Sequence, residues 1–193
     1  MPVSLVIFDM DGTITHELLD FDAIRRDIGL PHRAPILEAI EKLTPEEKSR
    51  AEAILHEHEA TAAGKCELHE GAVETLAALR SRGVHTALLT RNSAHCAQLV
   101  LRRHNLTFDY VASRENRPHK PHPDSILNIV RRFGVRKDQT FMVGDYLYDL
   151  DAAAAAGVRS VLVCLKDGGK PPHFADKATY CVTKLPAILE LLA

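Results

Sequence analysis

A short apolar run that ends in two aspartates constrains this chain more than any other feature. Residues 5–8 read Leu-Val-Ile-Phe, and residues 9–13 read Asp-Met-Asp-Gly-Thr. An apolar, β-branched run of this kind predicts a strand that is buried on both faces of a parallel sheet. The two aspartates then lie at the carboxyl end of the strand, which is the edge where open α/β sheets bind ligands.

The side chains of Asp9 and Asp11 repel each other unless a cation or a shared proton compensates their charges. Carboxylate oxygens are hard ligands, so the expected cation is Mg²⁺. Gly12 allows a sharp turn and brings backbone N–H groups close to a bound anion. A nucleophilic carboxylate beside an acid, a metal and an anion site suits phosphoryl transfer through an aspartyl phosphate. The alternative is an Asp-rich turn with no function beyond its local structure.

Strand and helix patterns alternate through most of the remaining chain. Apolar, β-rich runs predict strands at residues 86–90, 110–112, 141–144, 160–164 and 179–182. Periodic apolar residues predict helices at residues 71–82, 93–104, 123–133 and 147–156. Such alternation predicts an α/β fold of three layers, with helices on both faces of a parallel, Rossmann-like sheet.

Residues 17–68 interrupt the alternation, because they contain helical patterns and no convincing strand. One helical pattern covers residues 33–43, and a capping box at Thr44, with proline at the first helical position, starts a long helix. We therefore expect an α/β core formed by residues 1–16 and 69–193, with residues 17–68 inserted as a small helical cap. Both connections of the insert lie beside the predicted site, which favours the role of a lid.

The predicted strand at residues 86–90 ends in Thr90, whose hydroxyl group is suited to bind a phosphate oxygen. Arg91 and Asn92 follow it, and their backbone amides are placed to help. The alternative is that these polar residues only cap the next helix. Among the charged residues, Arg91 and Arg114 are the best placed to reach an anionic group of a substrate.

Lys120 lies in a loop at residues 117–124 that contains three prolines, and these limit the positions open to its side chain. Its ammonium group is suited to neutralise an aspartate nucleophile and the oxygens of a transferred phosphoryl group. The alternative is a solvated loop lysine. The candidate phosphate-binding residues are Gly12, Thr13, Thr90, Arg91, Asn92 and Lys120.

The strand at residues 141–144 also ends in glycine and aspartate, and a second aspartate follows four residues after the first. Asp145 is suited to complete the coordination of Mg²⁺. Asp149 is suited to lie outside the coordination sphere, where it would hold a metal-bound water or Lys120. The alternative is that both acids only stabilise the start of a helix through its dipole.

These segments, D-x-D-G-T, a strand-end Thr, Lys-Pro and G-D-x-x-x-D, resemble in type and order the motifs of the haloacid dehalogenase superfamily. The resemblance is to the phosphatase type with a helical cap inserted after the first motif, similar to phosphoglycolate phosphatase. It implies Asp9 as the nucleophile, Asp11 as the general acid and base, and Thr90 and Lys120 as phosphate ligands. It also implies Mg²⁺ held by the Asp9 carboxylate, the Asp11 backbone carbonyl and Asp145.

The function expected from this pattern is Mg²⁺-dependent hydrolysis of a small phosphate monoester, with phosphoglycolate-like or sugar phosphates as first candidates. Asp11 argues against dehalogenases and phosphonate hydrolases of the same family, which lack an acid at that position. A phosphomutase similar to β-phosphoglucomutase keeps both aspartates and stays an alternative. A catalytically silent binding module on this fold is a second alternative.

Composition is that of an ordinary globular chain. The net charge of −2 gives no basic field for nucleic acid, and no apolar run reaches the length of a membrane span. Four cysteines without a C-x-x-C motif suggest reduced, structurally passive thiols and a cytoplasmic location. The expected partner is a small phosphorylated metabolite, without nucleic acid or membrane, and the expected state is a monomer or homodimer.

Overall fold

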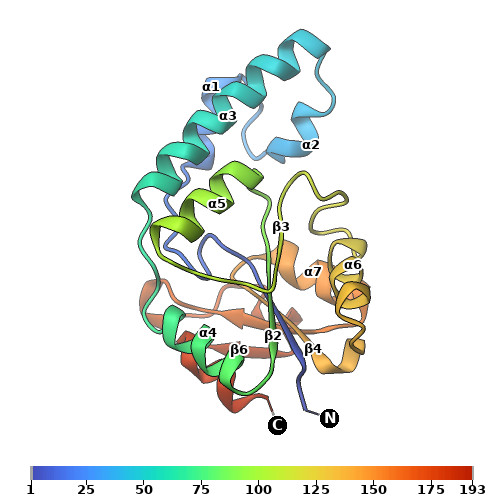
Figure 1. Ribbon diagram of the computed structural model, residues 1–193. Coiled ribbons are helices and arrows are strands. Elements are labelled where there is room, and N and C mark those ends of the chain that lie inside the picture. Colours follow the sequence, from blue (N-terminus) through green and yellow to red (C-terminus); the bar gives the residue numbers. More distant parts are fainter. Residues whose placement is uncertain (1, 193) are drawn as a thin grey trace. The chain divides into compact units, whose positions relative to one another are not determined.

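The structure of the protein, a computed structural model, describes residues 2–192 and divides into two compact units. The first unit contains the chain up to Glu17 and from Glu67 onward, and it holds the sheet labelled in Figure 1. The second unit spans Leu18–Cys66 and is entirely helical in its regular structure.

The sheet of the first unit has six parallel strands in the order β3-β2-β1-β4-β5-β6 among the described residues. The strands are β1 (Leu5–Phe8), β2 (His85–Leu89), β3 (Tyr110–Ala112), β4 (Thr140–Gly144), β5 (Arg159–Val163) and β6 (Tyr180–Val182). Each predicted strand is therefore present, shifted by at most one residue at its ends. The order and the parallel pairing confirm the predicted α/β, Rossmann-like fold.

The central strand β1 is buried along its whole length, as its apolar sequence predicts. Phe8 pairs with Leu88 of β2 on one side and with Val143 of β4 on the other. Because the three strands are parallel and in this register, the residues that follow them emerge at one edge of the sheet. That edge carries the polar segments identified in the sequence.

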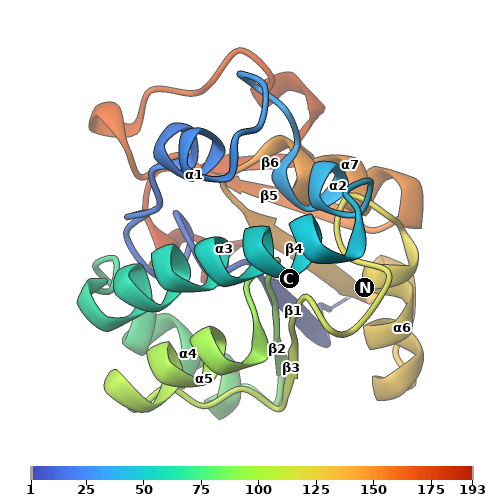
Figure 2. The same cartoon turned by 90° about the horizontal axis from the view of Figure 1, so that it is seen from above.

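Helices cover both faces of the sheet, and Figures 1 and 2 show them in two perpendicular views. Helices α4 (Ala72–Ser81) and α5 (Ala94–Arg103) lie on one face, and α6 (Asp124–Phe133) and α7 (Leu147–Ala156) lie on the other. These four helices match the predicted ones within one residue at each end. The face under α6 and α7 is a continuous apolar core that includes Leu5, Ile7, Ala87, Met142, Ile126, Ile129, Ala152 and Ala153. Short 3-10 turns complete the unit at Lys137–Gln139 (η1), Asp167–Gly169 (η2), Ala175–Lys177 (η3) and Leu185–Glu190 (η4).

The helical unit contains α1 (Phe21–Ile28), α2 (Ile36–Ile40) and α3 (Pro45–Lys65). The predicted capping box is present, because the Thr44 side chain accepts from the Glu47 backbone N–H and Glu47 accepts from the Thr44 N–H. Helix α2 is shorter than the pattern at residues 33–43 predicts. It starts after Pro35, and the residue before a proline is disfavoured in the helical conformation. The unit has its own apolar core of Ile24, Ile36, Ile40, Ala51 and Leu55.

The chain leaves and re-enters the first unit along two paired segments. The His16 N–H donates to the Glu67 carbonyl at 2.9 Å, and the His69 N–H donates to the Ile14 carbonyl at 2.9 Å. An antiparallel bridge joins Thr15 to residue 68 between these hydrogen bonds. The two connections to the helical unit are thus fixed side by side.

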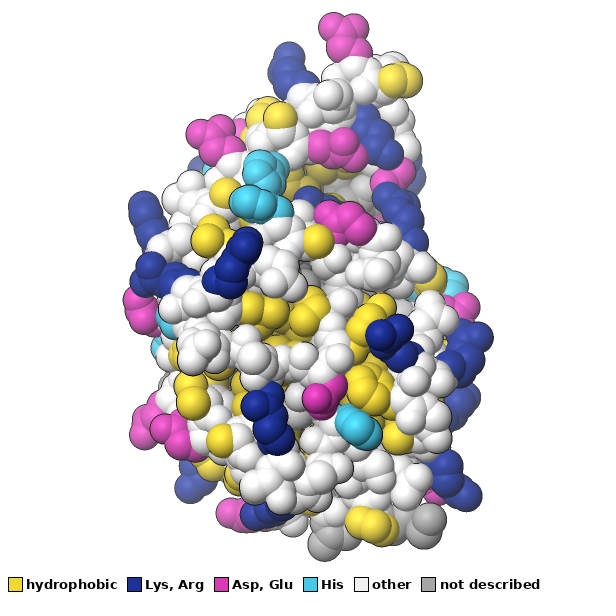
Figure 3. Space-filling view, viewed as in Figure 1, with side chains coloured by type: hydrophobic (Ala, Val, Ile, Leu, Met, Phe, Trp, Pro, Cys, Tyr) yellow, Lys and Arg dark blue, Asp and Glu magenta, His cyan; other side chains and the backbone are white. Residues whose placement is uncertain are grey.

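The surface shows no concentration of one charge on the face in Figure 3, where basic and acidic side chains are interspersed. Among residues 2–192, no helix combines the length and the apolar character that crossing a bilayer requires.

Candidate active site

The predicted acidic and hydroxyl side chains meet at the carboxyl edge of the three central strands. Asp9 directly follows β1, Thr90 follows β2 and Asp145 follows β4. The Asp9 N–H donates to the Val143 carbonyl of β4 at 2.8 Å, so the ladder still fixes the backbone at this aspartate. The edge of the sheet thus brings these three residues together.

Lys120 is buried, with only 2% of its surface exposed, so it is not a solvated loop lysine. Its Nζ atom lies 2.6 Å from Asp9 Oδ1 and 2.6 Å from Asp149 Oδ1. Burial alone would lower the pKa of Lys120, but the charges of Asp149 and Asp9 outweigh this effect and raise the pKa. An ammonium group whose charged form is favoured therefore bridges two of the predicted site residues.

Three carboxyl groups crowd around this lysine. Asp9, Asp145 and Asp149 each place one oxygen within 4.8 Å of the other two. Burial, together with the negative charges of Asp9 and Asp149, raises the pKa of Asp145 to about 7. Burial also raises the pKa of Asp149 to about 6, although Lys120 opposes this shift. The raised pKa values indicate excess negative charge that the protein itself does not neutralise.

This donor set fits a hard divalent cation such as Mg²⁺, whose preferred ligands are oxygens. Asp149 is less suited to direct coordination, because Oδ1 accepts from Lys120 and Oδ2 accepts from the Tyr146 N–H at 3.1 Å. Asp9 and Asp145 are therefore the better side-chain ligands. Asp149 is placed to hold Lys120. This is one of the two roles that the sequence analysis considered for Asp149.

Two glycines allow the carboxyl groups to approach the backbone. Gly12 has a φ of +78°, and a Cβ atom there would lie 2.0 Å from Asp145 Oδ2. At Gly144 a Cβ atom would lie 2.2 Å from the Asp149 carboxyl group. The amide of Gly12 donates to the Thr15 carbonyl at 2.7 Å. The structure thus gives Gly12 a role in packing against Asp145, and the anion-binding role of its N–H stays a prediction.

Thr13 and Asn92 contact the acids through their side chains. Thr13 Oγ1 lies 3.5 Å from Asp145 Oδ1, at the limit of a hydrogen bond. Asn92 Nδ2 donates to Asp11 Oδ2 at 2.7 Å. Thr90, which is buried, accepts from the Asn92 N–H through Oγ1 at 3.1 Å. Asn92, a predicted phosphate ligand, is therefore placed to orient the carboxyl group of Asp11.

Arg91 braces the loop that carries Lys120. Its guanidinium group donates to the backbone carbonyl of Lys120 and lies over the ring of Tyr148, 4.7 Å from the centroid. The backbone N–H of Arg114 donates to the Asn92 carbonyl at 2.9 Å. These contacts tie the loops after β2 and β3 to the loop before α6.

Sequence reasoning missed Lys166 and Glu17. Lys166 Nζ lies 2.5 Å from Glu17 Oε2 and 3.4 Å from Asp145 Oδ2, so this lysine reaches both the acidic cluster and the connection to the helical unit. Burial alone would lower the pKa of Lys166. The carboxylates of Glu17 and Asp145 outweigh this effect, so the pKa is raised. Lys166 belongs to no sequence motif. Its contacts with Asp145 and Glu17 depend on the path of the loop after β5, which the sequence does not predict.

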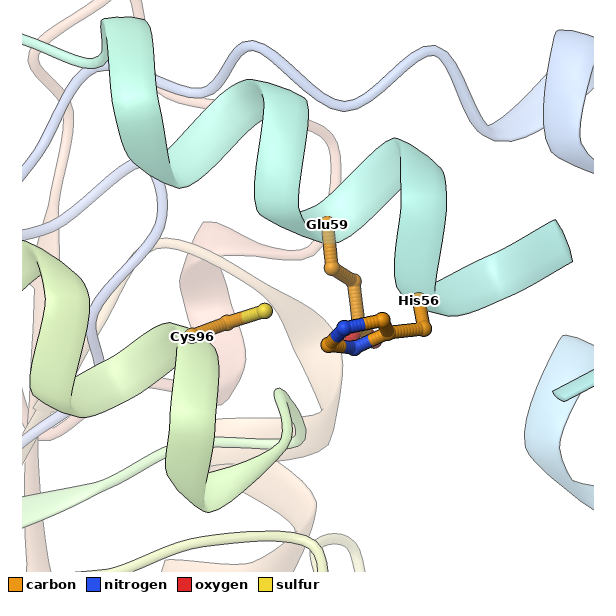
Figure 4. A group of neighbouring side chains, drawn as sticks. All are labelled: His56, Glu59 and Cys96. Carbon is orange, nitrogen blue, oxygen red and sulfur yellow. The ribbon is translucent and has the colours of Figure 1, made fainter. Parts of the chain in front are cut away.

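Two histidines of the helical unit, His56 and His58, lie on α3. His56 and Glu59, one turn apart, project from the same side of α3 (Figure 4). His58 Nε2 lies 2.8 Å from Asp27 Oδ2 of α1, inside the helical unit. The residues assigned above to the candidate active site all belong to the first unit.

Comparison with known proteins places this arrangement in a family. The family model described as haloacid dehalogenase-like hydrolase matches residues 6–163. A haloacid dehalogenase-like hydrolase domain-containing protein of Arabidopsis thaliana is 31% identical over 174 residues, which cover 84% of this chain and 70% of the relative. A phosphoglycolate phosphatase of Nitrosococcus oceani is 28% identical over 191 residues, which cover 85% and 84% of the two chains.

The fold agrees with this placement. The crystal structure of a predicted phosphoglycolate phosphatase from Haemophilus somnus superposes with a TM-score of 0.76 at 23% identity, and covers 99% of this chain and 98% of that one. The matched segment of the family model includes Asp9, Asp11, Thr90, Lys120 and Asp145. The chain belongs to the haloacid dehalogenase-like hydrolases, as its motifs predict.

Proposed function

We propose that this hydrolase is a Mg²⁺-dependent phosphatase that cleaves a small phosphate monoester through an aspartyl phosphate, the acyl phosphate of Asp9. The observation that carries the proposal is the buried ammonium group of Lys120, 2.6 Å from both Asp9 and Asp149, beside the carboxyl group of Asp145. A carboxylate that is held by a charged lysine at the end of a strand, with 14% of its side chain exposed, is poised to attack phosphorus. The phosphatase name of the Nitrosococcus oceani relative supports the same reaction class.

Each side chain has a defined part in the proposed reaction. Asp9 attacks phosphorus while Asp11 donates its proton to the leaving alcohol oxygen. Asp11 then takes a proton from a water molecule, which attacks the phosphorus and releases inorganic phosphate and free Asp9. Lys120 offsets negative charge on the phosphoryl oxygens as they are transferred.

Mg²⁺ would be held by the carboxyl groups of Asp9 and Asp145 and by the backbone carbonyl of Asp11. When bound, it supplies positive charge that offsets the repulsion between these acids and the incoming phosphate. The pKa of Asp145, raised to about 7 by burial and by its acidic neighbours, supports a site built to receive a cation.

Asn92 has the role of a positioning residue in this scheme. Its amide donates to Asp11 Oδ2 at 2.7 Å, which fixes the orientation of the carboxyl group that exchanges a proton with the substrate. Replacement of Asn92 by Ala should lower kcat by about tenfold or more and leave KM nearly unchanged, since general acid–base catalysis is worth about 10²–10⁴-fold. Asn92→Ser, which supplies a hydroxyl donor in place of the amide, should recover part of the loss.

The test of the function is trapping of the covalent intermediate. Purified full-length Asp11→Asn enzyme is mixed with Mg²⁺ and an aryl phosphate, whose good leaving group needs little protonation. Asp9 should become phosphorylated and stay so, because no base activates water. Peptide mass spectrometry should then find the phosphoryl group on the peptide that contains Asp9.

The Asp9→Asn, Asp11→Asn double variant is the matched control and should give no adduct. Wild-type enzyme should release inorganic phosphate from one or more members of a panel of phosphorylated metabolites, and a chelator should stop the release. Return of an isomeric sugar phosphate would instead indicate a phosphomutase. An enzyme inert toward the aryl phosphate and the whole panel would indicate a silent binding module.

A further inference from the structure

Two cysteines that sequence spacing does not connect lie in contact at one edge of the sheet. Cys164 directly follows β5, and Cys181 is the middle residue of the neighbouring parallel strand β6. Leu162 pairs with Cys181, so Cys164, two residues further along, points to the same side of the sheet. The two Sγ atoms are 3.1 Å apart.

The two thiols differ in their access to solvent. Cys181 is exposed, whereas Cys164 is buried in an apolar cluster with Leu150 and Leu162. Burial raises the pKa of the Cys164 thiol to about 12, so this thiol stays protonated near neutral pH. A reagent from solution therefore reaches Cys181 first, and the buried Cys164 sulfur is in contact with the Cys181 sulfur.

We propose that Cys164 and Cys181 form a dithiol site that closes to an intramolecular disulfide on reaction with a low-molecular-weight disulfide such as oxidised glutathione. Cys181 attacks one sulfur of the reagent, which forms a mixed disulfide and releases one glutathione thiolate. Cys164 then loses its proton to solvent, and its thiolate attacks Cys181 Sγ and displaces the second glutathione. The two cysteines lose two electrons and two protons in total, and the reagent is reduced to two thiols.

Closure needs only a small movement. A disulfide bond is about 2.05 Å long, so the sulfurs must approach by about 1 Å from their present contact. Cys164 lies just beyond the last residue of β5, where the chain begins the loop toward η2 (Asp167–Gly169). Its backbone N–H donates to the Val182 carbonyl of β6 at 2.8 Å, so rotation of the two side chains, and not a shift of the backbone, should bring the sulfurs together.

The position of the pair gives the disulfide a structural consequence. It would close a loop formed by residues 165–180, which includes Lys166. Lys166 contacts both Asp145 and Glu17, so the oxidised pair would anchor the start of the segment from which this lysine reaches the acidic cluster. The dithiol site itself does not depend on the proposed phosphatase activity, because its test measures thiols.

The experiment uses full-length wild-type protein incubated with oxidised glutathione at pH 8, then denatured and alkylated. Of the four cysteines, two should become protected from alkylation, and peptide mapping should show Cys164 linked to Cys181. A reductant should restore all four thiols. Cys66 and Cys96 are buried and serve as internal controls that should stay alkylatable after denaturation.

Variants separate the two chemical steps. Cys164→Ser should stop at a stable glutathione adduct on Cys181, and Cys181→Ala should leave Cys164 unmodified. Cys96→Ser, with the pair intact, should behave as wild type. Because Cys181 is exposed, Cys181→Ala keeps the test valid even if Cys164→Ser does not fold.

The oxidised protein should also melt at a higher temperature than the reduced protein, by about 6–12 °C for a loop of this length. A glutathione adduct on wild-type Cys181 that never resolves, a crosslink to Cys66 or Cys96, or full alkylation of all four thiols would overturn the proposal. A melting temperature that falls on oxidation would do the same, since the native contact would then not accommodate the bond.

Discussion

Replacement of Asp145 by Asn should stabilise the metal-free protein while it removes the proposed metal site. In the folded protein the carboxyl group of Asp145 is largely buried and close to Asp9 and Asp149, which raises its pKa from 3.8 to about 7. The unfolded chain binds this proton only at low pH. Wild-type stability should therefore fall as the pH rises from about 4 to about 7, because folding must then hold an unfavourable charge.

The magnitude follows from the two pKa values. A difference of about three units, at about 1.4 kcal/mol per unit, corresponds to about 4 kcal/mol at pH 8. Asn carries no charge, so the Asp145→Asn variant should avoid most of this loss. Lys166 loses one acidic neighbour in the variant but keeps Glu17 at 2.5 Å, so a gain of about 2–4 kcal/mol is expected.

The assay is urea unfolding with a chelator at pH 4 and at pH 8, followed by circular dichroism. The two proteins should be similar at pH 4 and should differ most at pH 8. Added Mg²⁺ should then stabilise the wild type and not the variant, because a ligand that binds only the folded state shifts the equilibrium toward it.

Asp151→Asn is the matched control, since it makes the same Asp-to-Asn change at a half-buried position of α7, where Asp151 contacts Lys177 at 3.2 Å. It should change stability by about 0.5 kcal/mol or less at either pH. If Asp145→Asn were no more stable than the wild type at pH 8 without metal, the inference of uncompensated charge at this site would be refuted.

Three further substitutions test other parts of the site. Asp9→Asn should keep the fold and lower turnover by about 10³-fold or more, measured as phosphate release, whereas near-normal turnover would place the nucleophile elsewhere. Lys120→Met should lower the free energy of unfolding in urea at pH 7 by about 3–5 kcal/mol, because it leaves Asp9 and Asp149 without their cation. A decrease of less than about 1 kcal/mol would contradict the role of Lys120 in bridging the two aspartates. Gly12→Ala should weaken Mg²⁺ binding measured by calorimetry, since its Cβ atom would displace Asp145, and Gly29→Ala is the control because no atom lies within 4 Å of a Cβ atom there.

Much of the fold is predictable from the sequence because its signals are local. The strands are short apolar runs, and the helices after β2, β3 and β4 end within one residue of the predicted positions. Gly134 and Gly157 end two of these helices in the left-handed conformation, which the sequence marks directly. The edge of the sheet then follows from the parallel arrangement, and with it the meeting of Asp9, Thr90 and Asp145.

The sequence does not predict contacts between segments that lie far apart in the chain and carry no common motif. Lys166 reaches Asp145 and Glu17 through a loop whose path depends on the packing after β5. The contact between Cys164 and Cys181 depends on the register of β5 against β6, and their spacing matches no known motif. The domain boundaries, the residue roles and the action of residues 17–68 as a lid stay predictions.

The charges of the site explain why these residues occur together. Asp9, Asp145, Asp149 and Glu17 carry four formal negative charges when ionised, and the lysines that contact them, Lys120 and Lys166, carry two positive charges. Asp11 is not counted, because it holds a proton in the first step of the proposed reaction. The residual charge equals that of one divalent cation with its sign reversed. A fold that buried this excess without a ligand would lose stability, and a fold that neutralised it with further lysines would have no reason to bind a metal. The excess negative charge therefore lowers the stability of the protein without a metal ion. The same excess makes the binding of a cation favourable.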